Sequence, residues 1–278
     1  MSARSVDALI SQIEKSQHLV VLTGAGCSTD SGIPDYRDAN GEWKNAQPIQ
    51  YPDFLRSHAM RQRYWARSMV GWQRVADAQP NRAHVALARL EHAGKLRRLI
   101  TQNIDGLHQL AGSREVIDLH GRLANVICLA CGDRRSRKAL QQELVSLNPG
   151  WQGFGATQAP DGDARLDADF KSFRIPDCER CGGYLKPDVV FFGEAIPPHR
   201  VTESTDAVHE ADMLLVVGSS LMVWSGFRFV RTASERGIPT ALINLGRTRA
   251  DELFTHRITQ DCGDTLTHIG NRFCQLQR

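Results

Sequence analysis

The segment from Thr101 to Cys131 contains several residue types that could carry chemistry. Asn103 and Asp105 follow one apolar run, and His120 follows a second. One amide and one carboxylate side chain complement the NH₂ and C=O of a carboxamide, although both residue types also form turns and cap helices. His120 could be a satisfied core histidine. Open α/β sheets bind ligands at the carboxyl edge of their strands, however, and this position favours a titrating base.

Four of the seven cysteines form two C-x-x-C pairs, Cys128 with Cys131 and Cys178 with Cys181. Two tight turns that each present two sulfurs fit a tetrahedral zinc ion held by four thiolates. A redox pair beside an unrelated pair is the alternative. Four sulfur ligands leave no open position on the metal, so we predict one structural Zn²⁺ rather than a catalytic one.

A second candidate site is the glycine-containing turn Thr23–Ser28, which follows an apolar run. Glycines at such a turn let the backbone approach a phosphate, and the amide N–H groups of the turn and of the following helix start are expected to face the anion. Thr29 stands where the dinucleotide-binding pattern has its third glycine, so the motif alone is weak. The loop Ser31–Arg37 then packs an acid, an aromatic residue and a cation close together.

The elements that must position these residues can be predicted from short unbroken apolar runs, which are typical of strands buried on both faces. The predicted strands are Leu19–Leu22, Leu96–Thr101, Val116–Leu119, Val189–Phe192, Met213–Val217 and Thr240–Leu245. Apolar residues at helical spacing predict helices in three regions: after Ser5, which is a candidate N-cap, over residues 53–93, and after Cys262. The second region includes a capped helix at Asn81–Gly94.

Strands that alternate with helices indicate an α/β fold: a Rossmann-like, doubly wound parallel sheet with an inserted small zinc-binding module and a helical insertion. We expect a first Rossmann-like part at 1–121, which contains the helical insertion at about 44–93. The zinc-binding module follows at 122–188 with a long loop at 148–163, and the second Rossmann-like part is expected at 189–278.

Composition limits the remaining function classes. The 278 residues are 41% hydrophobic and carry a net charge of +3, from 34 Lys and Arg against 31 Asp and Glu. This balance gives no charge-based reason to expect a nucleic-acid or membrane partner. The chain shows no signal-peptide pattern and no apolar run of bilayer length, so we expect a cytoplasmic protein. The sequence does not determine the oligomeric state, and a monomer is our expectation.

Taken together, the motifs resemble those of the sirtuin family. They are GAGCSTDSGIPDYRD, TQNIDGLH, LHG, the paired C-x-x-C, KPDVVFFGE, VVGSSL and INLG, which occur in the family's order over nearly the whole chain. The segment RQRYWARSMVGW and the long loop between the cysteine pairs are most similar to class II members, the group of the mitochondrial lysine-deacylase and ADP-ribosyltransferase enzyme.

The resemblance implies that NAD is a co-substrate. It places the pyrophosphate over the first glycine turn, the adenosine half near Asn244, and the nicotinamide between the TQNID segment and the loop after Ser31. The implied cofactor-binding residues are Gly24, Ala25, Gly26, Cys27, Ser28, Ile33, Pro34, Asp35, Tyr36, Arg37, Gln102, Asn103, Ile104, Asp105, Gly218, Ser219, Ser220, Asn244, Leu245, Gly246 and Cys262.

The implied reaction is NAD-dependent deacylation of lysine in proteins. The acyl-lysine carbonyl oxygen would attack C1′ of the nicotinamide ribose, and His120 would act as general base on the ribose hydroxyls. The implied products are nicotinamide, deacylated lysine and O-acyl-ADP-ribose. The implied catalytic residues are Gln102, Asn103, Asp105 and His120.

The resemblance also implies an inserted substrate peptide that is flanked by Val189, Val190, Phe191, Phe192, Gly193 and Glu194. The spacing of Tyr64 and Arg67 is similar to that of sirtuins that remove acidic acyl groups, and we expect a preference beyond acetyl. A solvated arginine beside a core tyrosine is the alternative.

Three other functions stay open from the sequence. Mono-ADP-ribosyl transfer to protein would use the same NAD site. An NAD-dependent oxidoreductase is disfavoured because no acidic residue ends a strand about twenty residues after Gly26. A zinc-ribbon binding module without catalysis is the third.

Overall fold

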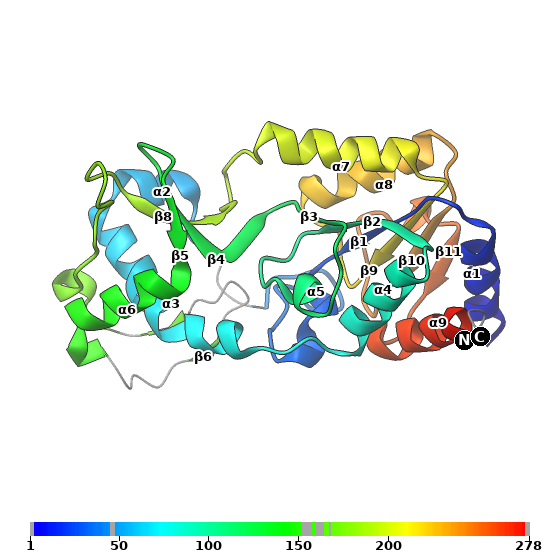
Figure 1. Cartoon of the computed structure of the whole chain (residues 1–278), viewed down its shortest axis with the longest axis horizontal. Helices are drawn as coiled ribbons and strands as arrows, with labels where there is room; N and C mark the ends of the chain where they lie inside the picture. Colours follow the sequence, from blue (N-terminus) through cyan, green and yellow to red (C-terminus); the bar gives the residue numbers. More distant parts are fainter. Residues whose placement is uncertain (1–2, 45–47, 152–156, 159–163, 167, 276–278) are drawn as a thin grey trace.

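The computed structural model describes residues 3–44, 48–151, 157–158, 164–166 and 168–275 of the chain. Two lobes lie end to end (Figure 1), a large one built on a six-stranded sheet and a small one built on a three-stranded sheet. None of the described helices is long and apolar enough to cross a membrane.

The large sheet is parallel throughout, with the strand order β11-β10-β9-β1-β2-β3. After β1 the chain adds strands to one side, and it later returns to add strands to the other side, so the topology reverses between β1 and β9. Ligand crevices of doubly wound sheets lie at such a reversal. The bounds are β1 Leu19–Thr23, β2 Leu96–Thr101, β3 Val116–Asp118, β9 Met213–Val217, β10 Thr240–Ile243 and β11 His256–Ile258.

Helices cover both faces of this sheet (Figure 1). On one face lie α1 Ala3–Lys15, α4 Arg82–His92 and α9 Cys262–Gln275; on the other lie α7 Pro198–Glu210 and α8 Trp224–Glu235. Within β1, Val21 packs with the first layer, whereas Val20 and Leu22 pack with the second. Because both faces are buried, the strand reads as an unbroken apolar run, and the predicted fold class is confirmed.

The small lobe combines an antiparallel sheet, in the order β5-β4-β8, with three helices. Its core is rich in aromatic side chains, among them the fully buried Trp65, Phe54 and Phe173. The bounds are β4 Gly121–Cys128, β5 Arg134–Ser136, β8 Leu185–Val189, α2 Tyr51–Arg56, α3 His58–Asp77 and α6 Arg137–Leu147.

Short elements complete the described chain. The helix α5 spans Leu107–Leu110, and β6 Thr157–Gln158 pairs with β7 Ala164–Arg165. Single 3₁₀ turns occur at Ala25–Cys27, Thr29–Ser31, Pro149–Trp151, Phe170–Ser172 and Asp251–Leu253. Much of the predicted loop 148–163 lies outside the described residues.

The prediction that Val189–Phe192 forms a strand of the large sheet is wrong. Only Val189 is in a strand, β8, which pairs antiparallel with β4 through Gly121. Phe192 forms an isolated bridge with Gln50. The apolar run is explained by burial of Phe191 and Val189 in the core of the small lobe, and apolar composition alone does not say which sheet a strand joins.

Other element predictions were wrong in detail. The first helix begins at Ala3, so Ser5 lies inside it rather than at the N-cap. No α-helix starts after Gly26, because two 3₁₀ turns follow and Gly32 ends them at φ 80°. The strand β11 was missed, since its three residues carry only one apolar side chain in HRI.

The helix predicted at Asn81–Gly94 is confirmed as α4. The Asn81 side chain accepts hydrogen bonds from the Ala83 and His84 N–H groups, and Gly94 has the positive φ expected of a helix stop. Its apolar face packs on the large sheet, whereas α2 and α3 belong to the small lobe. We therefore propose that the helical insertion ends near Asp77.

Replacing Leu99 with Ala should lower the free energy of unfolding by about 2–5 kcal/mol, because a fully buried side chain at the centre of β2 would leave a cavity. The matched control is Leu110→Ala, whose side chain is 62% exposed and which should change the value by less than about 0.5 kcal/mol. Urea unfolding measures both. Equal effects of the two substitutions would contradict the assigned core.

Candidate functional site

A cavity of about 840 Å³ opens where the carboxyl ends of β1 and β9 meet the segment between β8 and α7. Its size falls within the range of about 300–1,000 Å³ that is usual for ligand pockets. The predicted residues that line it are Gly24, Ala25, Gly26, Ser28, Ile33, Pro34, Asp35, Tyr36, Arg37, Tyr64, Gln102, Asn103, Ile104, Asp105, His120, Val189, Val190, Phe191, Phe192, Gly193, Glu194, Gly218, Ser219, Ser220, Asn244, Leu245, Gly246 and Cys262.

Two predicted residues are not part of this wall. Cys27 belongs to the turn after β1, but its side chain is 1% exposed and packs into the core of the large lobe. It is therefore not among the residues that line the cavity. Arg67 is likewise not among the described residues that line the cavity, whereas Tyr64, one turn earlier on α3, is.

The glycines of the first turn are required by packing against a second turn. The Gly24 N–H donates to Val217 O at 3.0 Å, and the Gly26 N–H donates to Gly218 O at 2.9 Å. A Cβ at Gly24 would lie 2.7 Å from the Cβ of Ser219. Protein carbonyls already accept from these two N–H groups, so the predicted contact with an anion would have to come from other amides of the turn. Glycine is needed here for close approach of two turns.

A hydrogen-bonded chain joins the polar cluster after β2 to this turn. Asn103 Nδ2 donates to Gly24 O at 3.0 Å and to Ser28 Oγ at 3.1 Å. Ser28 Oγ donates to Asp105 Oδ2 at 2.7 Å, and Asp105 Oδ1 accepts the Leu107 N–H at 2.9 Å. The bond from the Leu107 N–H to Asp105 is a turn-forming contact, and together these contacts fix the side chains at the cavity wall.

His120 lies at the junction between the two lobes. Its Nδ1 donates to Gln102 O at 2.9 Å, because a carbonyl can only accept, and its Nε2 then accepts from Ser225 Oγ at 2.9 Å. Burial, opposed by the bond to Gln102 O, lowers the pKa of His120 to about 4, with smaller contributions from Arg200 and Arg228. The imidazole is therefore neutral near pH 7, with its lone pair on Nε2, the nitrogen that faces Ser225 Oγ.

The side chain of Gln102 is held beneath this base. Its Nε2 donates to Ser219 Oγ at 2.8 Å and to Thr23 O at 3.3 Å. A Cβ on Gly226 would lie 2.6 Å from Gln102 Oε1, so glycine at that position of α8 makes room for the amide. Residues from β1, β2, β9 and α8 thus meet at one point.

The turn after β10 forms another part of the wall. Asn244 Nδ2 donates to Gly246 O at 2.9 Å, and Leu245 is 65% exposed. Burial raises the pKa of the nearby Cys262 to about 12, so this cysteine stays a neutral thiol. The exposed apolar side chain of Leu245 and the ordered turn around it can bind a flat, partly apolar group.

Three aromatic rings close one side of the cavity. Tyr36, Trp43 and Phe192 pack edge to face with centroid distances of 5.5–6.2 Å. The guanidinium of Arg37 lies 4.1 Å from the centroid of the Trp43 ring and donates to Gly41 O. Phe192 comes from the segment after β8, so these contacts tie the loop after β1 to the small lobe.

An apolar part of the cavity reaches into the core of the small lobe. It is lined by Ile33, Tyr64, Val75 and Phe191, which are all nearly buried, and by Ile104. Tyr64 packs on the rings of Phe54, Trp65 and Phe191 at centroid distances of 5.1–5.6 Å. Such a wall suits an extended aliphatic chain more readily than a small polar group.

Below the segment after β8, a buried ion pair fixes the backbone. Lys186 is 3% exposed, and its Nζ donates to Glu194 Oε2 at 3.1 Å and to Pro187 O at 3.2 Å. Glu194 Oε2 also accepts the Phe191 N–H at 2.8 Å. Glu194 therefore supports the loop from within as well as lining the cavity.

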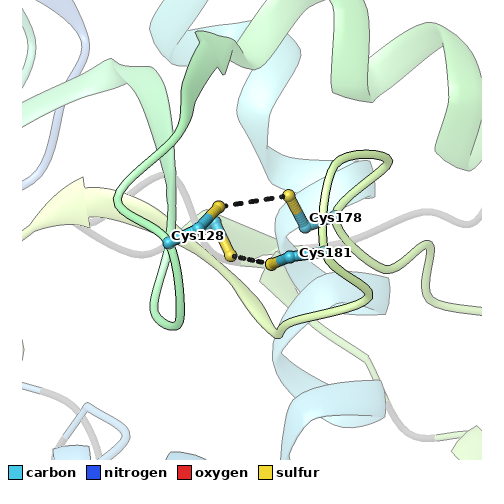
Figure 2. Close-up of side chains that lie close together, drawn as sticks. Cys128, Cys178 and Cys181 are labelled. Carbon is cyan, nitrogen blue, oxygen red and sulfur yellow. Dashed lines mark hydrogen bonds between the residues drawn. The ribbon is translucent and has the colours of Figure 1, made fainter.

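The four predicted metal ligands come together in the small lobe, at the end of β4 and in the loop before β8. Sγ atoms are 3.5 Å apart for Cys128 and Cys181, and 3.8 Å apart for Cys131 and Cys178. Figure 2 shows the side chains of Cys128, Cys178 and Cys181 directed toward a common centre. A tetrahedral zinc with Zn–S bonds of about 2.3 Å needs sulfurs about 3.8 Å apart, so this donor set fits the ion.

A second group of possible ligands lies beneath the cavity and is better explained as core. Cys27, His84 and His108 are all buried, with their ligand atoms within 4.8 Å of one another. His84 Nδ1 accepts the Asn81 N–H as part of the helix cap, and His108 Nε2 contacts Thr23 Oγ1 at 2.9 Å. Ligation by His84 Nε2 would need a proton shift that breaks the cap, so structural roles are favoured.

Among the lining residues that sequence reasoning missed are Ser225 and Arg228, both on α8. No motif marks them. Their only signal is position, because they follow the VVGSSL turn at helical spacing, and which face of the helix meets the cavity depends on how α8 packs.

The Sir2 family model matches residues 24–225 of the chain. A Bradyrhizobium diazoefficiens protein described as NAD-dependent protein deacetylase 2 is 54% identical over 258 residues, covering 92% of this chain and 94% of that protein. The mitochondrial NAD-dependent protein lipoamidase sirtuin-4 of Bos taurus is 48% identical over 264 residues, covering 94% of this chain and 84% of that protein.

Solved structures agree with these relatives. A Sir2 complex with a p53 peptide and NAD⁺ superposes with a TM-score of 0.78 at 28% identity, covering 98% of both chains. A Sir2 homologue bound to NAD superposes with a TM-score of 0.77 at 29% identity, covering 98% of this chain and 95% of that one.

Removal of the metal should loosen the small lobe. Cys178→Ser is expected to lower the zinc content from one ion per chain to none, and to speed hydrogen exchange in β4, β5 and β8 while β1 and β9 stay protected, since structural zinc contributes folding energy. Cys262→Ser is the matched control and should keep the ion. Full zinc content in Cys178→Ser would contradict the assigned ligand set.

His120 should make stability depend on pH. Its pKa is about 4 in the folded chain and about 6.5 when unfolded, so the unfolded state takes up the proton first as the pH falls. The stabilisation is present above about pH 6.5 and is lost toward pH 4, amounting to on the order of 2–3 kcal/mol. Urea unfolding at about pH 7.5 and pH 5 should give a smaller difference for His120→Asn than for wild type, with the exposed His209→Asn as control. An unchanged difference would contradict the buried neutral state.

Proposed function

The chain belongs to the Sir2 family, and we propose that it is an enzyme that uses NAD to remove acyl groups from lysine side chains of proteins. The observation that carries the proposal is the neutral His120 at the cavity wall, whose ring is oriented by Gln102 O at Nδ1 and by Ser225 Oγ at Nε2. The relatives described as NAD-dependent protein deacetylases support the same chemistry.

We assign the NAD-binding roles along the cavity from one end to the other. The turn after β10, with Asn244 and Cys262, would hold the adenosine half. The two interlocked turns at Gly24 and Ser219 would lie under the pyrophosphate. Asn103 and Asp105, with Ile33, Asp35 and Ile104, would surround the nicotinamide, which is a flat carboxamide-bearing ring.

His120 would serve as the general base. The acyl-lysine carbonyl oxygen attacks C1′ of the nicotinamide ribose as the bond to nicotinamide breaks, and His120 Nε2 then accepts a proton from a ribose hydroxyl that attacks the acyl carbon. Hydrolysis of the resulting adduct yields free lysine and O-acyl-ADP-ribose. Proton transfer of this kind contributes roughly 10²–10⁴-fold to a rate. Gln102, tied to Ser219, would position the ribose.

The substrate would be a protein segment bound in extended form. The backbone leaves β8 at Val189 and runs along the cavity to Glu194, opposite the turn at Ser219. An extended peptide placed between them would be recognised through main-chain hydrogen bonds. A Sir2 structure with bound acetylated peptide is one of the structural neighbours, at 28% identity and a TM-score of 0.77.

The apolar part of the cavity near Tyr64 and Val75 supports acyl groups longer than acetyl. The bovine relative described as a lipoamidase favours the same direction. We keep Tyr64 as a proposed acyl contact. Because Arg67 is not among the described lining residues, we propose that any effect of it on acyl choice acts through the α3 residues that face the cavity.

The four-cysteine site would hold one zinc ion that stabilises the small lobe and takes no part in the reaction, since four thiolates leave no open position. Transfer of ADP-ribose to protein is not favoured, because the relatives that support a function here are described as deacetylases or a lipoamidase. A monomeric state, the absence of a nucleic-acid partner and a cytoplasmic location stay predictions.

A panel of peptides that differ only in the lysine acyl group should give O-acyl-ADP-ribose and free lysine when incubated with NAD, with acyl chains longer than acetyl turned over best. His120→Ala should lower kcat by roughly 10²-fold or more through loss of the base. His209→Ala, on the exposed surface of α7, is the control and should match wild type. Mass spectrometry follows every product.

Three results would overturn parts of this proposal. Acetyl as the best substrate would remove the preference for longer chains. ADP-ribose attached to protein, with no loss of acyl groups, would favour the transferase. Full activity of His120→Ala would exclude this residue as the base.

A further inference from the structure

We propose that Arg228 recognises an acidic side chain next to the acyl-lysine in the substrate protein. The inference rests on the proposed deacylase function and adds to it a preference in the peptide sequence. It concerns a residue that no motif of the chain singles out.

Arg228 lies on the same face of α8 as the residue that contacts the base. Ser225 and Arg228 are three residues apart in a helix, a spacing that places side chains on one face. Ser225 Oγ lies 2.9 Å from His120 Nε2, and all three residues line the cavity. The positive charge of Arg228 also lowers the pKa of His120, which indicates that the two groups are near one another.

Arg228 combines two features among the described charged residues that line the cavity: it has no partner of opposite charge, and one of its donors is buried. Asp35 pairs with Lys44, and Glu194 pairs with Lys186, at 2.5 and 3.1 Å. Within the part of the chain that the structure describes, Arg228 forms no ion pair or hydrogen bond, and its Nε is buried without an acceptor. A buried donor of a charged group without an acceptor is costly, so an anionic partner from outside the chain is expected.

The position of Arg228 favours the peptide as the source of that anion. At the start of α8, Val223 and Trp224 are 39% and 41% exposed and also line the cavity, and we place the peptide beside them. The acyl chain is expected in the apolar part near Tyr64, in the core of the small lobe, and the pyrophosphate at the turn after β1. We therefore place the anion on a neighbouring side chain of the peptide.

A carboxylate suits this position chemically. The planar guanidinium donates two parallel hydrogen bonds to the two carboxylate oxygens, which is stronger and more selective than a neutral pair. An Asp or Glu flanking the acyl-lysine should therefore raise kcat/KM by about tenfold over Gln, mainly through KM, and Lys should lower it.

The test uses peptides that carry one preferred acyl-lysine and differ at a single flanking position, with Glu, Gln or Lys placed there in turn. Wild type should prefer Glu at one of these positions. Arg228→Met should lose the discrimination, and Arg228→Glu should prefer Lys at the same position. The matched control is Arg236→Met, which removes one positive charge at the C-terminal end of α8, from an exposed residue that does not line the cavity.

Several outcomes would overturn the inference. Equal kcat/KM for the Glu, Gln and Lys peptides at every position in wild type would do so, as would identical discrimination in Arg228→Met. A rise in KM for NAD with all peptides alike would assign Arg228 to the cofactor. Loss of discrimination among acyl groups instead of flanking residues would assign it to the acyl site.

Failure of the proposed function is distinguishable from failure of this inference. If wild type turns over no peptide, deacylation is wrong, and the inference is then tested by fluorescence anisotropy of labelled acyl-peptides. Tighter binding of the Glu peptide that reverses in Arg228→Glu would support it without any turnover. Equal binding of all the peptides would overturn it.

Discussion

The site depends on the contact between the two turns that follow β1 and β9. Gly24 and Gly26 donate to Val217 O and Gly218 O, and a side chain at either glycine would collide with the opposite turn. Because the strands are parallel neighbours, their carboxyl ends lie at one edge, and this contact holds the edge together. Asn103 and Gln102 form hydrogen bonds with residues of these two turns, among them Ser28. The contact between the turns therefore also positions the polar residues after β2.

His120 connects this pair of turns to the small lobe. His120 accepts the Val190 N–H at its carbonyl, while its ring reaches Gln102 O on one side and Ser225 on the other. The segment after β8 and the edge of the large sheet are therefore both bound to His120. A change in how the two lobes sit would move the ring nitrogen relative to both of its partners, so the lobes must be docked for the base to be placed.

A feature could be predicted from the sequence when its signal lies within a short segment of the chain. Apolar runs predicted the strands β1, β2 and β9, and the spacing of the cysteines predicted the cluster of Cys128, Cys131, Cys178 and Cys181. The structure contains both. Val189–Phe192 shows the limit, since an apolar run says that a segment is buried but not which sheet receives it. Ser225 and Arg228 enter the site through the rotation of α8, and Arg67 stays out of the wall for the same reason on α3, because a helix face is chosen by tertiary packing.

The antiparallel pairing of β4 with β8 has a consequence for how the chain reaches this structure. Its partners, Gly121 and Val189, are distant in sequence, with the whole cysteine module between them. Closing such a loop costs chain entropy before any contact repays it, so this pairing is expected late in folding. Zinc would shorten the effective loop by clamping its two cysteine turns, and the segment that faces His120 would then assemble only once the metal is in place. The metal, which would take no part in the reaction, would thereby set the order in which the elements around His120 assemble in a newly made chain.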